Sequence, residues 1–87
     1  MDWKLQYSKR AVKDVELLRR AGLIPRLKRL LEVLIENPFQ NPPPYEKLTK
    51  DLRGKYSRRI NVQHRLVYEV FKKEKVVRIL TAWSHYE

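Results

Sequence analysis

The sequence predicts a small α+β domain in which two helices cover one face of a largely antiparallel sheet. Three observations support this fold class. The 87 residues fit one domain, spanning 1–87. Apolar residues recur at helical spacing between residues 11 and 34, and strand-like patterns lie on both sides of that region. The resulting order is β-α-α-β-β-β, which leaves the other face of the sheet open to water or a ligand.

A short strand is expected at the start of the chain, where apolar and polar residues alternate. Trp3, Leu5 and Tyr7 fall on one side of this segment and would share a buried face. Lysine and glutamine separate them on the other side. The strand leads directly into the first helical pattern.

The first helix is expected to begin after Ser8, a residue type that favours the N-cap position, and to end at Gly22. Its predicted apolar side is formed by Ala11, Val12, Val15 and Leu18. Its predicted polar side is formed by Lys13, Asp14 and Arg19. A few residues separate this helix from the next, so the pair is expected to form an αα-hairpin.

The second helix has the stronger amphipathic stripe. Pro25 suits its first turn, and Asn37-Pro38 ends it because proline disfavours the α conformation in the residue before it. The apolar stripe consists of Leu23, Leu27, Leu30, Leu31 and Leu34. The following segment, FQNPPPYEKL, is expected to be an extended connection, because three consecutive prolines fit neither a helix interior nor a central strand.

Three strands are expected in the remainder of the chain, at Ser57–Val62, His64–Phe71 and Val76–Ser84. The first carries Ile60 and Val62 on one parity. The second places alternate residues on opposite faces: Leu66, Tyr68 and Val70 against Arg65, Val67 and Glu69. The KKEK sequence at 72–75 suits a polar turn between the last two strands.

The composition points to a polyanionic partner. The net charge is +10, and it is uneven: residues 1–46 hold 9 basic and 6 acidic residues, whereas residues 47–87 hold 11 and 4. The absence of cysteine excludes disulfides and thiolate metal sites, and two histidines are too few for a His-rich zinc site. No apolar run reaches membrane-span length and no signal peptide is visible, so a cytoplasmic location is expected.

Basic residues gather on the predicted open face of the sheet. Arg65 and Arg59 come from neighbouring strands, where like charges repel unless an anion such as phosphate relieves them. Cleavage of RNA without a metal needs a base, cations and an acid, and Glu46, these arginines and His85 supply those groups. Taken one at a time, each basic residue also suits a solvated face, and His85 also suits an ordinary surface position.

A longer pattern favours the chemical interpretation. Residues 56–68 read YSRRINVQHRLVY, and His85-Tyr86 follows. The combination of SRRI, HRLVY and HY resembles the YoeB/Txe family of the RelE superfamily, the ribonuclease toxins of bacterial type II toxin–antitoxin pairs. The resemblance implies a RelE-like, microbial-ribonuclease-like fold. It also implies ribosome-dependent cleavage of mRNA to a 2′,3′-cyclic phosphate, without metal or cofactor, and hence inhibition of translation.

The resemblance also implies roles for particular residues. Glu46 matches the general base of the family, and His85 matches the general acid. Arg65 matches the phosphate-stabilising arginine, Tyr86 matches the tyrosine that shapes the active site, and Arg59 matches a basic residue of the same groove.

One departure from the family pattern concerns a lysine that often follows the glutamate. Here Lys47 or Lys50 would take its place, and Arg58 is a further expected substrate-binding residue. The expected partners are a small acidic antitoxin of the YefM/Axe type, the ribosome and mRNA. The toxin alone is expected to be a monomer or homodimer, and a hetero-oligomer with its antitoxin.

Two alternatives remain open at this point. One is a non-catalytic toxin of the same fold, as in the ParE branch that acts on DNA gyrase, although that branch lacks the Glu, Arg and His-Tyr set. The other is a basic RNA-binding or ribosome-associated module, which would bind RNA in a salt-dependent way without cleaving it.

Overall fold

The computed structural model describes residues 2–48 and 54–83, and within these ranges it contains two helices and five strands. In chain order the elements are β1 (Lys4–Tyr7), α1 (Lys9–Arg20), α2 (Ile24–Glu36), β2 (Glu46–Lys47), β3 (Lys55–Arg59), β4 (Arg65–Phe71) and β5 (Val76–Thr81). This order confirms the α+β class.

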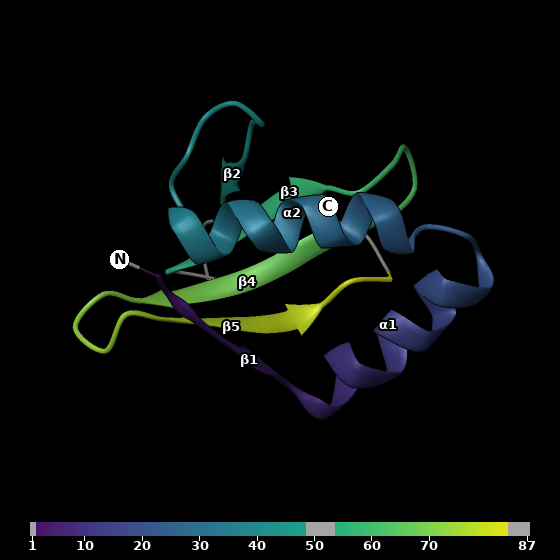
Figure 1. Cartoon of the computed structure of the whole chain (residues 1–87), viewed down its shortest axis with the longest axis horizontal. Helices are drawn as coiled ribbons and strands as arrows, with labels where there is room; N and C mark the ends of the chain where they lie inside the picture. Colours follow the sequence, from purple (N-terminus) through teal and green to yellow (C-terminus); the bar gives the residue numbers. More distant parts are fainter. Residues whose placement is uncertain (1, 49–53, 84–87) are drawn as a thin grey trace.

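The strands form one mixed sheet in the order β1-β5-β4-β3-β2. β1 runs parallel to β5, and the other neighbours are antiparallel. Helix α2 lies across one face of this sheet (Figure 1), and α1 packs against β5. The predicted antiparallel-rich sheet with an αα-hairpin on one face is therefore confirmed.

Local chemistry sets the ends of the helices as expected. The Oγ of Ser8 accepts a hydrogen bond from the Ala11 amide at 3.0 Å and donates one to the Leu80 carbonyl at 2.8 Å. The N-cap residue of α1 therefore also connects the start of this helix to β5. Gly22 follows the helix with a φ of 74°, a left-handed conformation that glycine adopts without strain. α2 ends at Glu36, immediately before Asn37-Pro38.

The buried face of α1 differs from the predicted one. Val12 is 61% exposed, whereas Asp14 is only 2% exposed. The Asp14 carboxylate accepts a hydrogen bond from the Ala82 amide at 2.9 Å, which compensates its burial. The helix therefore turns Asp14 inwards, because a partner 68 residues away satisfies it.

The core lies between the helices and the inner face of the sheet. α2 contributes Leu27, Leu30 and Leu34, three residues of the predicted leucine stripe, all buried. Leu66 and Tyr68 of β4 belong to the same cluster, as their predicted parity requires. The apolar stripe thus correctly predicts which side of α2 meets the sheet.

The remaining differences between the expected and the observed fold concern the ends of strands and the strands at the edges of the sheet. β3 ends at Arg59, and Val62 is 89% exposed in a turn where the Asn61 side chain accepts from the amides of Gln63 and His64. Tyr7 is 42% exposed and so does not share the expected buried face. The expected extended connection contains a short strand, β2, because its end pairs with β3.

Candidate active site

A carboxylate and two arginines meet on the face of the sheet opposite the helices. Glu46 lies opposite Ser57 in the β2–β3 register, and Arg59 lies opposite Arg65 in the β3–β4 register. Because alternate residues of a strand share a face, Ser57 and Arg59 point to the same side of β3. Three neighbouring strands thus present Glu46, Ser57, Arg59 and Arg65 together.

The side chain of Arg65 holds this group together. Its Nη1 lies 2.8 Å from Oε1 of Glu46 and donates to Oγ of Ser57 at 3.0 Å. No hydrogen bond within the described ranges engages Nε or Nη2 of Arg65, so those donors can grip a phosphate in bidentate fashion. Ser57 is a further partner of Arg65, and the only sequence signal for it is that it shares the strand parity of Arg59.

These residues line a pocket of about 270 Å³, called the Glu46 pocket below. Its lining is Pro44, Tyr45, Glu46, Ser57, Arg59 and Arg65. The Glu46 side chain is 64% exposed and that of Arg65 is 20% exposed, so a ligand can reach both. An ion pair this open to water contributes about 0–1 kcal/mol. An incoming phosphate can therefore replace Glu46 as the partner of Arg65 at little cost and leave the carboxylate available as a base.

Aromatic packing fixes the segment that carries Glu46. The ring of Tyr45 lies edge-on to Tyr56, with 5.8 Å between centroids, and to Phe39, with 6.4 Å. The guanidinium carbon of Arg58 lies 4.9 Å from the centre of the Tyr45 ring. The residue before Glu46 is thus held from several sides, although β2 itself has only two residues.

Arg58 is buried, with no exposed surface. Its Nε donates to the Tyr68 hydroxyl at 3.0 Å, and its two terminal nitrogens donate to the carbonyls of Pro38, Gln40 and Pro43. The expectation that Arg58 binds substrate is wrong, because its charge faces the core and its donors hold the proline-rich loop. Strand parity signals this, since Arg58 shares the parity of the buried Ile60.

The phenol of Tyr68 completes this buried network. It donates to the Pro38 carbonyl at 3.2 Å while accepting from Arg58. Burial raises the pKa of Tyr68 above its ordinary value, and the neighbouring Arg58 charge offsets part of that rise. The network therefore holds a neutral phenol against a charged guanidinium beneath the Glu46 segment.

His64 ties the end of the described chain to the start of β4. Its ring stacks on Trp83 with centroids 4.0 Å apart, and its Nδ1 contacts the Trp83 carbonyl. Its own carbonyl accepts from the Ile60 amide at 2.9 Å, so His64 is a hydrogen-bonding turn residue just before β4. The backbone at Trp83 consequently lies beside the residue that precedes Arg65.

The remaining predicted site residues divide into two groups. Lys47 is exposed but is not among the residues that line the Glu46 pocket. Lys50, His85 and Tyr86 lie outside the described residues. Within the described ranges, no group of three or more His, Asp or Glu residues is placed to hold a metal ion. No helix in the same part of the chain is long and apolar enough to cross a membrane.

A family model now identifies the chain. The model for the YoeB-like toxin of bacterial type II toxin–antitoxin systems matches residues 7–86. The chain belongs to this toxin family. A toxin YoeB from Synechocystis sp. is 34% identical over 65 residues, which cover 75% of this chain and 73% of the relative.

Solved structures of YoeB-like toxins share the fold. A YoeB/ParE toxin from Agrobacterium tumefaciens superposes with a TM-score of 0.86 at 28% identity, over 95% of this chain and 99% of that one. The toxin–antitoxin heterotetramer YoeB–YefM from Staphylococcus aureus gives 0.81 at 29% identity, over 99% of this chain and 100% of that one. The likeness therefore covers the Glu46 pocket and the helices together.

Proposed function

We propose that this YoeB-like toxin is a ribosome-dependent mRNA endoribonuclease that inhibits translation. The observation that carries the proposal is the contact between Arg65 and Glu46 at 2.8 Å, inside a pocket that also holds Arg59. A base and two cations at one open site are two of the three kinds of group that metal-independent cleavage of RNA requires, and the third is an acid. Membership of the YoeB-like toxin family supports the same reaction, because the sequence resemblance to the YoeB/Txe toxins implies a ribonuclease.

The proposed reaction is a transfer within the RNA. Glu46 takes the proton of a 2′-hydroxyl, the 2′-oxygen attacks the adjacent phosphorus, and the bond from phosphorus to the 5′-oxygen breaks. His85 protonates the departing 5′-oxygen, so the products are a 2′,3′-cyclic phosphate and a 5′-hydroxyl. Arg65 and Arg59 stabilise the charge that builds on the phosphate. Tyr86 shapes the pocket, and Lys47 and Lys50 contact the RNA beside it.

The position of Trp83 supports His85 as the acid. Trp83 is held against His64, which is the sequence neighbour of Arg65. Two residues of chain span at most about 7 Å. The described part of the chain therefore ends, at Trp83, beside the start of the strand that carries Arg65, with His85 two residues further along the sequence.

An acidic antitoxin is the proposed regulator. The related toxin from Staphylococcus aureus forms a heterotetramer with YefM. A net charge of +10 favours rapid encounter between this chain and an acidic YefM/Axe-like partner. We infer that an extended antitoxin segment covers the Glu46 pocket and that the toxin without it is a monomer or homodimer.

Mapping of mRNA ends by primer extension after induction tests the proposal. The parent should cut mRNA on ribosomes, whereas Glu46→Gln and His85→Gln should lose most cutting and keep their folded circular-dichroism spectra. Glu74→Gln is the matched control, because Glu74 is exposed in the turn between β4 and β5. If both site variants cut mRNA at the rate of the parent, the assignment of Glu46 as the base and His85 as the acid would be wrong.

The same material separates the two alternative functions. A non-catalytic toxin of the ParE type would inhibit gyrase supercoiling and leave mRNA intact. An RNA-binding module would bind RNA in a salt-dependent way without forming a cyclic phosphate. Either result, obtained with the parent chain, would contradict the nuclease.

A further inference from the structure

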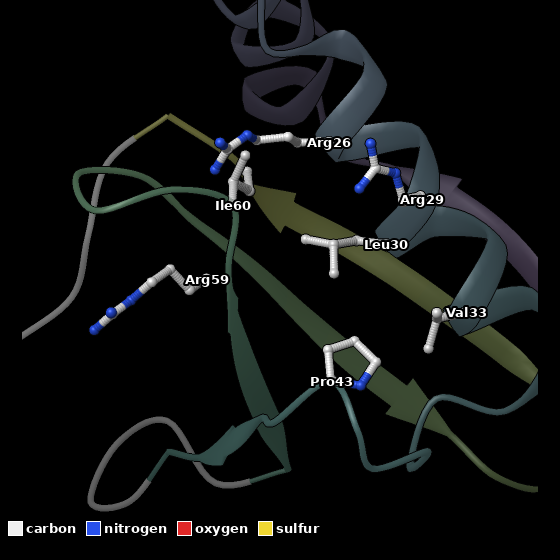
Figure 2. Close-up of a pocket in the computed structure, with 7 residues that line it drawn as sticks. All are labelled: Arg26, Arg29, Leu30, Val33, Pro43, Arg59 and Ile60. Carbon is white, nitrogen blue, oxygen red and sulfur yellow. The ribbon is translucent and has the colours of Figure 1, made fainter.

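A second, larger pocket lies between α2 and β3. It has a volume of about 460 Å³ and is called the arginine pocket below. Its lining is Arg26, Arg29, Leu30, Val33, Pro43, Arg59 and Ile60. Figure 2 shows Arg26, Arg29, Leu30 and Val33 on the α2 side and Arg59 and Ile60 at the end of β3, with the side chain of Arg59 directed away from α2.

The charges around this pocket are not compensated. None of the lining residues that the structure describes carries a carboxylate, and no ion pair within residues 2–48 and 54–83 joins Arg26, Arg29 or Arg59 to an acidic side chain. The guanidinium groups of Arg26 and Arg29 lie at the same end of this pocket and repel each other. An anionic ligand would relieve this repulsion, and a phosphate suits the planar fork of arginine better than the point charge of lysine.

The arginine pocket adjoins the Glu46 pocket through Arg59. This residue lines both cavities, and the successive residues Pro43 and Pro44 line one cavity each. Pairing between β2 and β3 stops at Ser57. Prolines 42–44 have no amide hydrogen with which to continue the ladder, so no described strand pairs with the outer edge of β3 beside Arg59. A linear ligand can therefore extend from one pocket into the other.

We propose that the arginine pocket is a second RNA subsite, which takes a nucleotide next to the cleaved bond. Arg26 and Arg29 bind its phosphate, and its base or ribose packs on Leu30, Val33 and Ile60. A cationic groove combined with apolar contact is the usual way in which single-stranded nucleic acid is held. The proposal rests on the proposed nuclease function, and it adds a contact outside the residues assigned to the reaction.

The pocket chemistry also predicts little choice among bases. Among the described residues, no asparagine, glutamine, aspartate or glutamate lines it. Such side chains read base edges, as arginine also does, but here both α2 arginines are assigned to the phosphate. The aliphatic surface accepts any base, and the arginines contact a phosphate that every nucleotide carries. The subsite should therefore increase affinity for RNA of any sequence.

Binding of non-cleavable RNA tests the subsite. The probes are labelled 2′-O-methyl oligonucleotides, a dinucleotide that spans one phosphate and a hexanucleotide, titrated with the full chain by fluorescence anisotropy. Arg26→Gln/Arg29→Gln should weaken hexanucleotide binding about tenfold and leave the dinucleotide unchanged. The slope of log affinity against log salt should fall by about 1.4, as expected for two lost phosphate contacts to a single strand.

The matched control is Lys28→Gln/Lys73→Gln, which removes the same charge from exposed positions that do not line either pocket. It should change hexanucleotide affinity by about twofold or less. Equal hexanucleotide affinity in the two double variants would overturn the subsite. So would an arginine variant that keeps its RNA affinity but loses affinity for a poly-glutamate peptide, because the pocket would then be a site for acidic protein.

Failure of the nuclease is distinguishable from failure of the subsite. If the parent binds the hexanucleotide through Arg26 and Arg29 but forms no cyclic phosphate from unmodified mRNA on ribosomes, the subsite stands and the nuclease does not. If the parent cleaves mRNA and the arginine variant binds and cleaves as the control does, the nuclease stands and the subsite does not.

Discussion

Two consecutive arginines of β3 have opposite environments. Arg58 has no exposed surface and gives its donors to Tyr68 and to three carbonyls of the proline-rich loop. Arg59 is exposed and lines both pockets. The two side chains differ only in strand parity, which sends one to the helix-covered face and the other to the open face. The same residue type is thus a structural group on one side of the sheet and a ligand-binding candidate on the other.

The two faces differ in energetic terms as well. On the covered face, Arg58 and Asp14 are buried, so removing their partners leaves unsatisfied groups away from water. On the open face, the Glu46–Arg65 pair is solvated and contributes little to stability. Variants of the covered face should therefore lose stability, and variants of the open face should lose activity without unfolding.

The largest expected effect is on the open face. Arg65→Gln should lower the rate of mRNA cleavage by about 10²–10³, the loss typical of one group that stabilises transition-state charge. The free energy of unfolding should change by less than about 1 kcal/mol. Quantitative primer extension and urea unfolding of the same preparations measure the two effects.

Arg78→Gln provides the control for that variant. Arg78 is exposed and lies opposite Glu69 in the β4–β5 register, on the same face as Arg65. It should cleave as the parent does. An Arg65 variant that unfolded easily, or an Arg78 variant with the same loss of cleavage, would break the distinction between a specific site and a generally basic face.

The second prediction concerns the covered face. Arg58→Leu should lower the free energy of unfolding by about 3 kcal/mol, because several buried acceptors lose their donor. Arg59→Leu, one residue along the chain, should change it by about 0.5 kcal/mol or less. Urea unfolding compares them directly. Equal losses in the two variants would show that strand parity does not separate their roles.

The sequence predicts the features that local chemistry determines. Ser8 as N-cap and Asn37-Pro38 as a helix stop follow from residue type, and the leucine stripe correctly predicts the buried side of α2. The alternation in β4 predicts that Arg65 lies on the open face, and the structure shows it there at 2.8 Å from Glu46.

Features set by long-range contacts could not be predicted in this way. Asp14 looks like a polar-face residue of α1, since its partner is the amide of Ala82 near the other end of the chain. β2 follows shortly after three prolines, which disfavour a strand, and it forms because Glu46 and Lys47 pair with β3. The role of Arg58 depends on both kinds of feature. Its strand parity can be read from the sequence, but its partners are loop carbonyls that no spacing rule indicates.

The third prediction tests a buried contact between α1 and the residue that follows β5. Asp14→Ala should lower the free energy of unfolding by about 2 kcal/mol, because the buried Ala82 amide loses its acceptor. Cleavage should fall too, since Ala82 leads towards the proposed acid at residue 85. Asp14→Asn retains an acceptor, so it should keep much of the stability and of the cleavage that the alanine variant loses.

Hydrogen exchange at the Ala82 amide, followed by NMR, should be faster in the alanine variant than in the parent, and much less so in the asparagine variant. An unchanged exchange rate at Ala82 in the alanine variant would mean that Asp14 does not hold the end of β5.

The smallest expected effect is a pH dependence on the covered face. Because burial raises the pKa of Tyr68 above 10.0, the unfolded chain releases this proton before the folded chain does. The stability from the neutral phenol is therefore fully present below about pH 10 and is lost as pH rises through the higher pKa of the folded protein.

Tyr68→Phe should cost about 1 kcal/mol at neutral pH through the lost hydrogen bonds. Above about pH 10 the gap between the parent and this variant should narrow, as measured by urea unfolding at successive pH values. Lysines titrate in the same range, but they do so in both proteins and cancel from the difference. If the difference in the free energy of unfolding stayed constant, the phenol would not be held neutral beside Arg58. Water would then have more access to the covered face than the complete burial of Arg58 indicates.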